Sequence, residues 1–323
     1  MSYAHYDPAA VIKWLDYPGC INAVRQAMSA FSASEAPQPL RTIIPLAPLK
    51  VLALMPGFLM DEAAADKLGI YGGKIISVVR NPENVGRSKH HGLVIVFDPK
   101  TGELVCSADA GEVTEIRTAC ASAVATDALA RKCARRMTIF GAGAQAKSHI
   151  EAIRHVRDLD DVRIWARDYD KAATFAADMA LSTGLRVYAV ASAVDACKGA
   201  DIICTTTGSS EPILLREWVE DGTHLNIVGS SGPGPVEVDN DLVVASRYIA
   251  DSRRSVLAAG AEFLVAKEAG LIGDDHIVAE IGEILNGTVI GRGKDTDITF
   301  YKSLGHVVQD LCSAAYIHAK ATA

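Results

Sequence analysis

The chain lacks several features that are typical of membrane, secreted and nucleic-acid-binding proteins. None of its apolar runs approaches the ~20 residues that a membrane-spanning helix needs. Residues 1–8 lack a basic segment followed by an apolar one, so we expect no secretory signal. The net charge of −7 provides no overall attraction to nucleic acid or to an anionic membrane. We therefore expect small molecules, rather than nucleic acids or membranes, as partners.

The cysteines and histidines lack the spacing of a disulfide framework or a metal site. The seven cysteines are odd in number, scattered, and set mostly in apolar stretches: Cys20, Cys106, Cys120, Cys133, Cys197, Cys204 and Cys312. This usage is typical of reduced core thiols, so we expect a cytoplasmic protein. His149 and His155 are not an i,i+4 pair, and the other histidines show no ligand spacing either, so we assign no metal.

The composition is that of a globular chain with a large core. Its 323 residues, of which 49% are hydrophobic and 22% charged, suffice for two domains or one large one. From about residue 136 onward, runs typical of strands and helices alternate, which predicts a doubly wound parallel α/β sheet. The predicted strands of this sheet are 137–140, 162–165, 185–190, 201–206, 224–229 and 247–250.

The preceding part of the chain follows a different pattern. Short strand-like segments separated by Pro, Gly and Asn turns predict a mostly antiparallel α+β domain, with strands at 40–44, 50–56, 73–79, 92–98 and 103–108. The segment 98–102, Asp-Pro-Lys-Thr-Gly, is a hairpin signal. The Ala-rich segment 114–133 predicts a helix that bridges the two domains. The tail, 301–320, predicts another helix.

One stretch carries the most information about function. A buried strand runs into Gly141-Ala-Gly-Ala-Gln-Ala146, and a helix is predicted over 148–157. This is the dinucleotide-binding pattern G-x-G-x-x-G/A in its strand–turn–helix context, although an ordinary glycine-rich turn is the alternative. Gly141 permits the tight turn, Gly143 lets the backbone approach a pyrophosphate, and Ala146 lets helix and strand pack closely. Residues expected at the phosphates, by the helix N-terminus, are Gly141, Gly143, Ala144 and Gln145.

The residues after the second strand bear on the choice of cofactor. An acid there would hold the ribose 2′-OH of NAD, whereas an arginine favours the 2′-phosphate of NADP. Arg167 favours NADP slightly, while Asp168 leaves NAD open. Further contacts to the cofactor are expected from polar residues at two other strand ends, namely Thr205, Thr206, Thr207, Ser230 and Ser231.

Three cations in the first part of the chain are candidates for binding a carboxylate. Arg41, Lys74 and Arg117 each lie beside an apolar stretch, where an unpaired charge is costly. A bound carboxylate would satisfy them, and an arginine would do so with a bidentate fork. Structural ion pairs are the alternative, because Glu112 and Glu115 lie nearby in the sequence.

Taken together, these motifs resemble the ornithine cyclodeaminase/mu-crystallin family. The resemblance runs from about residue 37 to 311. It is carried by Gly73-Lys74, residues 92–103, 115–126, 141–145, 222–229, 280–285 and 298–305, and Gln309-Asp-Leu311.

The resemblance implies a homodimer and a two-domain chain. Residues 1–117 with 300–323 would form the substrate-binding and dimerisation domain, and residues 118–299 the Rossmann dinucleotide-binding domain. It also implies that Arg41, Lys74 and Arg117 hold the substrate carboxylate at the nicotinamide, with hydride transfer on an imino or amino acid.

The loop after the sixth strand departs from the cyclodeaminases. They carry Gly-Asp-Cys-Pro-Gly-Lys there, with the aspartate as catalytic acid/base, whereas this chain has Ser231 in the aspartate's place. A serine hydroxyl cannot act as such a base near neutral pH without an activating partner. The resemblance therefore indicates a reductase more than a cyclodeaminase-type lyase.

We expect NAD(P)H-dependent reduction of a small α-imino acid, with three alternatives kept open. A basic segment containing Arg87, Lys89, His90 and His91 could hold a second carboxylate, which would suit iminosuccinate, or could be a solvated loop. A cyclic ketimine reductase (for pyrroline-2-carboxylate) or an alanine dehydrogenase-like enzyme is the first alternative. A lyase that recycles its bound NAD, and a ligand binder of the mu-crystallin kind, are the others.

Overall fold

The computed structural model describes residues 3–34, 36–48, 50–60, 68–79 and 90–323. The chain divides into two compact units, one formed by Met1–Thr118 with His306–Ala323 and the other by Ala119–Gly305. The first boundary lies within helix α3 (Ala110–Leu129), one residue from the expected position. The second boundary lies between Gly305 and His306. The position expected for it, between residues 299 and 300, is inside strand β14 (Thr299–Lys302) of the second unit.

The first unit is built on a six-stranded sheet in the order β1-β6-β5-β4-β3-β2. Its strands are β1 (Ala4–Tyr6), β2 (Thr42–Ala47), β3 (Lys50–Met60), β4 (Leu68–Val79), β5 (His90–Phe97) and β6 (Leu104–Asp109). Strands β2 to β6 pair antiparallel in chain order, and β1 adds parallel to β6. The expected hairpin turn between β5 and β6 is present, where the Asp98 carboxylate accepts from the backbone N–H groups of Lys100 and Thr101.

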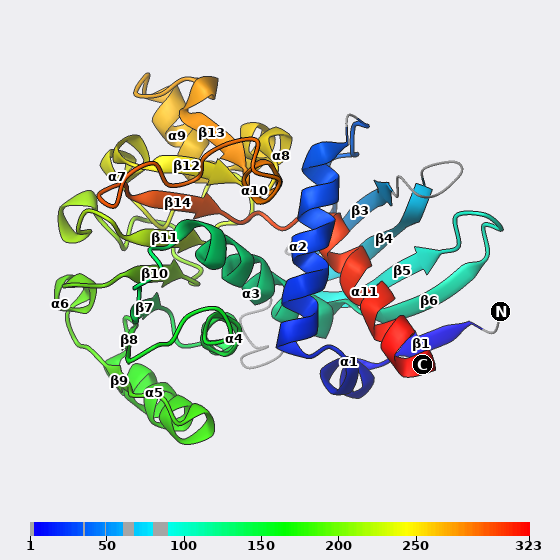
Figure 1. The fold of residues 1–323 in the computed structure, drawn as a ribbon, viewed down its shortest axis with the longest axis horizontal. Helices are drawn as coiled ribbons and strands as arrows, with labels where there is room; N and C mark the ends of the chain where they lie inside the picture. The colour runs from blue at the N-terminus through cyan, green and yellow to red at the C-terminus, as the bar shows by residue number, and fades with distance from the viewer. Residues whose placement is uncertain (1–2, 35, 49, 61–67, 80–89) are drawn as a thin grey trace. The chain divides into compact units, whose positions relative to one another are not determined.

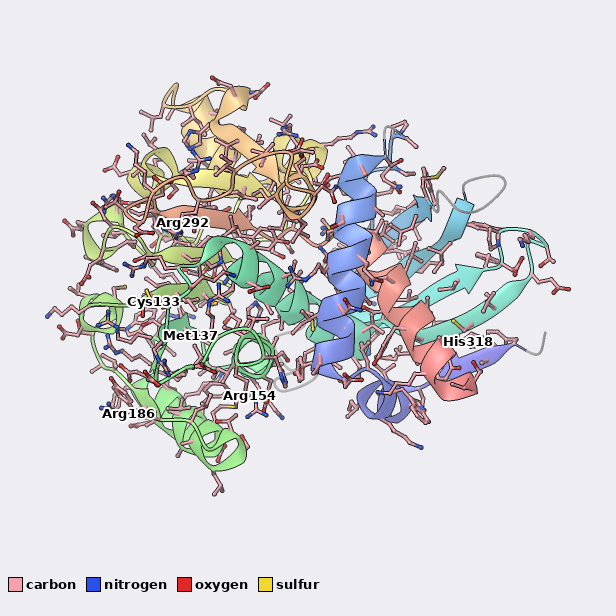
Figure 2. The ribbon with its side chains drawn as sticks, viewed as in Figure 1. Cys133, Met137, Arg154, Arg186, Arg292 and His318 are labelled. Atoms are coloured by element: carbon pink, nitrogen blue, oxygen red, sulfur yellow. The ribbon has the colours of Figure 1, made fainter. Side chains whose placement is uncertain are left out.

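Helices cover one face of this sheet. They are α1 (Pro8–Trp14), α2 (Tyr17–Ala33) and α11 (Val307–Thr322). Helices α2 and α11, from opposite ends of the sequence, pack side by side over the sheet (Figure 1). At the far end of α11, the ring of His318 hydrogen bonds the Tyr6 hydroxyl of β1 at 3.0 Å (Figure 2). Both chain ends therefore contribute to the same unit.

The expected start of the tail helix was wrong. Residues 301 and 302 lie in β14, and α11 begins only at Val307. Thr299, Phe300 and Tyr301 are β-branched or aromatic and favour a strand. Gly305, with φ of +82°, then breaks the chain direction before the helix.

The second unit is a doubly wound domain, which confirms the expected fold class. Its eight strands pair parallel in the order β13-β12-β14-β11-β10-β7-β8-β9. They are β7 (Arg136–Phe140), β8 (Asp161–Trp165), β9 (Val187–Ala189), β10 (Ile202–Thr205), β11 (His224–Ile227), β12 (Arg247–Ala250), β13 (Ile277–Glu280) and β14. The helices are α4 (Ala144–Ile153), α5 (Tyr169–Thr183), α6 (Ala193–Cys197), α7 (Asn240–Ala245), α8 (Arg253–Ala259), α9 (Ala261–Glu268) and α10 (Ile281–Leu285).

The central strands of this sheet are buried along their whole length. Every residue of β10, β11 and β14 is buried, as expected for parallel strands that are covered on both faces. Their carboxyl ends meet at one edge of the sheet, where an open α/β sheet binds its ligands. Within the described ranges, we find no helix both long and apolar enough to cross a membrane.

Candidate active site

The glycine-rich turn after β7 has the geometry that a dinucleotide requires. Gly141 has φ of +126°, and a Cβ there would lie 2.7 Å from Thr206 Oγ1, so only glycine fits. Gly143 is the N-cap of α4, and a Cβ there would meet no protein atom within 4 Å. No side chain caps the first turn of α4, which begins at Ala144 and Gln145, four residues before the expected start. The open space at Gly143 and these backbone N–H groups fit a pyrophosphate.

A substitution at Gly141 would strain the fold, whereas Gly143→Val can test cofactor binding without doing so. Its backbone is extended (φ −127°, ψ −170°) and the added side chain meets open space, so we expect the melting temperature to change little. The valine would occupy the space for phosphate, and we expect the Kd for NADH and NADPH to rise by about tenfold or more. Fluorescence titration and a thermal melt of the same sample test this. An unchanged Kd would remove Gly143 from the cofactor site.

The residues after β8 lie exposed at the same edge of the sheet. Asp168 is the N-cap of α5, and its Oδ1 accepts from Lys171 N at 3.1 Å. Arg167 is exposed beside it. Because Asp168 already has a helix-capping role, its presence at this position does not by itself indicate NAD.

Replacing Arg167 tests the choice of cofactor. We expect Arg167→Ala to weaken NADPH binding by about 1.5–3 kcal/mol, the contribution of a charge-assisted contact to phosphate. The unmodified ribose of NADH has no such charge, so NADH binding would change little. Calorimetric titration with each cofactor gives the comparison. Equal losses for both would show that Arg167 packs on the adenosine, and would leave Asp168 as the determinant.

Several hydroxyls that were expected to contact the cofactor are instead held by buried carboxylates. Thr205 is fully buried and donates to Glu237 Oε2 at 2.7 Å, so its side chain is not available to a ligand in this conformation. Thr207 donates to Glu237 Oε1 at 2.8 Å, and buried Ser230 hydrogen bonds Glu262. Direct contact of Thr205 and Ser230 with the cofactor stays a prediction, and in this structure both hydroxyls are buried and hydrogen bonded to carboxylates.

Thr206 and Ser231 remain at the edge of the sheet. Thr206 is half-buried, and its hydroxyl donates to Phe140 O at 3.2 Å, beside Gly141. Ser231 is exposed in the loop after β11.

In the first unit, two of the three expected cations converge on one buried carboxylate. Lys74 of β4 lies 2.8 Å from Asp310 Oδ1, and Arg117 Nε lies 2.9 Å from the same oxygen. The three side chains are 2%, 4% and 0% exposed, so the cluster is withdrawn from water. Lys74 also donates to Thr114 Oγ1, and Arg117 donates to Gln309 Oε1 at 2.8 Å.

Burial and neighbouring charges shift the pKa values in this cluster. Burial lowers the pKa of Lys74 to about 7, and the positive charges of Arg117 and Arg41 act in the same direction against the opposing effect of Asp310. Burial alone would raise the pKa of Asp310, but Arg117 and Lys74 lower it below its ordinary value. Asp310 is therefore an anion at neutral pH, while Lys74 exchanges its proton near pH 7.

Arg41 lies outside the strand in which it was expected, and Asp310 was not among the expected site residues. Arg41 is half-buried and precedes β2 instead of lying within the strand. Its positive charge nevertheless contributes to lowering the pKa of Lys74. Asp310, which the two cations share, was missed because it lies 236 residues after Lys74. Its signal was present in the Gln309-Asp-Leu311 motif, which on its own identifies no function.

The basic segment is described only at its end. Arg87 and Lys89 lie outside the described residues, and His90 begins β5 with only its backbone described. His91 is exposed and pairs with Ser77, whereas Lys74 pairs with Val94. Because side chains alternate along a strand, His91 and Lys74 point to opposite faces of the sheet in one chain. A role of His91 in holding a second carboxylate stays a prediction, and within one chain its side chain lies on the face of the sheet opposite to Lys74.

Known proteins resemble this chain over nearly its whole length. The profile of the ornithine cyclodeaminase/mu-crystallin family matches residues 9–323. A Delta(1)-pyrroline-2-carboxylate reductase of Bacillus cereus is 35% identical over 297 residues, 91% of this chain and 89% of the relative.

Two solved structures have the same fold. One is the Thermococcus litoralis Delta(1)-pyrroline-2-carboxylate reductase with NADH and L-proline (TM-score 0.91, 29% identity, 99% of this chain and 97% of that one). The other is the iminosuccinate reductase of Paracoccus denitrificans with NAD+ (TM-score 0.88, 26% identity, 98% and 96%). The chain belongs to the ornithine cyclodeaminase/mu-crystallin family.

Proposed function

We propose that this chain is an NAD(P)H-dependent reductase of a cyclic α-imino acid of the pyrroline-2-carboxylate kind, which it converts to the cyclic amino acid. The observation that carries the proposal is the buried cluster of Lys74, Asp310 and Arg117. Relatives that are named pyrroline-2-carboxylate reductases support the substrate class.

The charge of the cluster favours one further anion. Two cations share a single carboxylate, and Arg41 adds positive potential. An additional buried positive charge is costly without a partner, so a substrate carboxylate would stabilise the site. Arg117 binds that carboxylate with its guanidinium, and Lys74 with its ammonium. This places the carbon next to the carboxylate, which is the imine carbon, in a fixed position.

The reduction adds a hydride to carbon and a proton to nitrogen. When bound, the nicotinamide supplies the hydride. We assign the proton to Lys74, whose pKa of about 7 lets it hold and release a proton near neutral pH. Water then restores the Lys74 proton. Gly141, Gly143 and the first turn of α4 would hold the pyrophosphate.

A substrate panel tests this function. NADH and NADPH oxidation is measured with pyrroline-2-carboxylate, with oxaloacetate plus ammonia (which gives iminosuccinate) and with pyruvate plus ammonia. We expect the cyclic imine to react fastest, with one cofactor oxidised for each amino acid formed. Faster turnover of iminosuccinate would contradict the cyclic substrate. Proline release from ornithine without net cofactor consumption would indicate a lyase.

We also propose a homodimer that forms through the outer face of the first unit's sheet. Met55 and Val94 point toward the helices and are buried, whereas Ile75 and Leu93 on the opposite face are 42% and 36% exposed. Ile75 pairs with both Leu54 and Leu93, which gives an apolar row across three strands. Apolar rows of this kind mark interaction surfaces. Ile75→Glu should convert the dimer to a monomer in light scattering, and a wild-type monomer would contradict the proposal.

The state of the cysteines supports a reducing compartment. All seven are free thiols in this structure, and five of them are buried in strands or helices: Cys20, Cys106, Cys120, Cys197 and Cys204. We therefore propose the cytoplasm as the location of the reaction.

A further inference from the structure

Glu237 is a buried carboxylate with an unusual number of donors. Its Oε1 accepts from Thr207 N and Thr207 Oγ1, both at 2.8 Å. Its Oε2 accepts from Thr205 Oγ1 and Gly229 N, both at 2.7 Å. The side chain is fully buried. Because a backbone N–H group can only donate, each carboxyl oxygen must accept at least one hydrogen bond here, and the four contacts together suit the ionised carboxylate.

These contacts join two loops. Thr207 follows β10, and Gly229 follows β11. The loops also touch directly, since a Cβ on Gly229 would lie 2.0 Å from Thr207 O and 2.4 Å from Glu237 Oε1. Glu237 therefore fixes the distance between the carboxyl ends of neighbouring strands.

A second buried ion pair holds the next residue of the same loop. Lys302, at the end of β14, lies 2.7 Å from Glu262 Oε2, and both side chains are 0% exposed. The Ser230 hydroxyl contacts both Lys302 and Glu262. The Glu237 backbone N–H also donates to Glu262, so the two carboxylates belong to one network. Burial raises the pKa of Glu237, while its donors and Lys302 oppose that rise.

The network lies at the end of the sheet where half of the cofactor must sit. In a doubly wound fold the pyrophosphate binds at the first glycine turn, which here follows β7, and the adenosine ribose binds at the end of the next strand, β8. Strands β10 and β11 continue the sheet on the other side of β7. The nicotinamide half of the dinucleotide would therefore lie over the loops that Glu237 joins.

We propose that Glu237, supported by the Lys302–Glu262 pair, is a positioning residue for the nicotinamide half of the cofactor. It does not touch the cofactor. With that pair it holds Thr207, Gly229 and Ser230 at the spacing that receives the nicotinamide, whereas the adenosine half is held independently at Gly143 and Arg167. This inference rests on the nicotinamide cofactor of the proposed function but not on the identity of the imine.

Glu237→Gln tests the role with little change of shape. The amide nitrogen would face donors that it cannot accept from, so one of the loops must move. We expect the Kd for NADH and NADPH to rise by about tenfold, as for the loss of hydrogen bonds to a charged group. The Kd for ADP-ribose and 2′-phospho-ADP-ribose, which lack the nicotinamide, should stay within about twofold, because that half binds at a distant site.

Thr205→Val provides a second variant if Glu237→Gln folds poorly. It removes a single donor to Glu237 in a fully buried, nearly isosteric position. We expect the same pattern with a smaller shift in the NADH and NADPH values.

Asp201→Asn is the matched control. Asp201 is also a buried carboxylate of this unit, and it accepts from the backbone N–H groups of Arg135 and Arg136, both at 3.0 Å. Asp201 and these two N–H groups lie at the amino-terminal ends of the strands, opposite to the edge where Glu237 lies. We expect it to lower the melting temperature and to leave all four Kd values unchanged.

Two results would overturn the inference. One is an equal rise in the Kd for NADH and ADP-ribose in Glu237→Gln, which would indicate a merely structural residue. The other is an unchanged Kd for NADH in the folded variant. Because binding is measured without an imine, an unmodified protein that binds NADH but reduces no imine would contradict the proposed substrate and leave this inference standing.

Discussion

Replacing Lys74 by methionine will lower kcat/KM for the cyclic imine by about 10²–10⁴-fold, the range for a lost general acid. Methionine has a similar length and suits the buried position better than a charge does, so the unit should still fold. Asp310 would keep Arg117 as its partner. The Kd for NADH should be unchanged, because Lys74 belongs to the unit without the dinucleotide fingerprint.

The pH dependence gives a second measurement of the same role. Because the pKa of Lys74 is about 7, its charged form is lost as pH rises through that value, and kcat/KM of the wild type should fall with it. Lys74→Arg retains the charge, so the fall near pH 7 should be absent with the same substrate. Lys100→Met, at an exposed turn, is the control and should behave like the wild type. A Lys74→Met variant that retains near-full kcat/KM would remove Lys74 from the mechanism.

Asp310→Ala will destabilise the protein by about 3–5 kcal/mol, as expected when one partner of a buried ion pair is removed. Two buried cations would lose their shared carboxylate. Urea unfolding measures the loss. Asp195→Ala removes an exposed partner of Lys198 and should change stability little. If Asp310→Ala unfolds like the wild type, the cluster is already neutralised by another group.

The loss of stability in Asp310→Ala should depend on pH. Without Asp310, the pKa of Lys74 would fall below 7, because the attraction that opposes burial is gone. Below pH 7 the folded wild type would then bind a proton that the folded variant does not. The stability of the wild type relative to the variant should therefore increase as pH falls through 7. If the difference in unfolding free energy between wild type and variant is constant between pH 5 and 9, Asp310 does not raise the pKa of Lys74.

The sequence predicted the parts of the fold that depend on local pattern. The turn at Gly141 needs a positive φ and close approach, and both are visible as glycine and alanine spacing. Strand β14 was missed because its four residues join the middle of the sheet only through pairing with β11 and β12. A short apolar segment cannot show which distant strands it will pair with.

The sequence indicated the cations of the candidate site but not its anions. Lys74 and Arg117 stand out as charges in apolar segments, whereas Asp310 and Glu237 look like ordinary surface acids in the sequence. Their burial depends on tertiary packing of a helix and of a loop. The hydrogen bonds of Thr205 and Ser230 to carboxylates could not be predicted for the same reason, since Glu237 and Glu262 are distant in sequence.

The contribution of α11 to the first unit has a consequence for protein synthesis. Lys74 and Arg117 leave the ribosome long before Asp310, which lies in the last helix of the chain. Before α11 is synthesised, Lys74 and Arg117 lack the buried carboxylate that they share, while the second unit already has all of its strands. The nascent chain should therefore complete its dinucleotide-binding unit first, and a premature stop that removes α11 should release a product that binds cofactor but lacks the proposed substrate cluster.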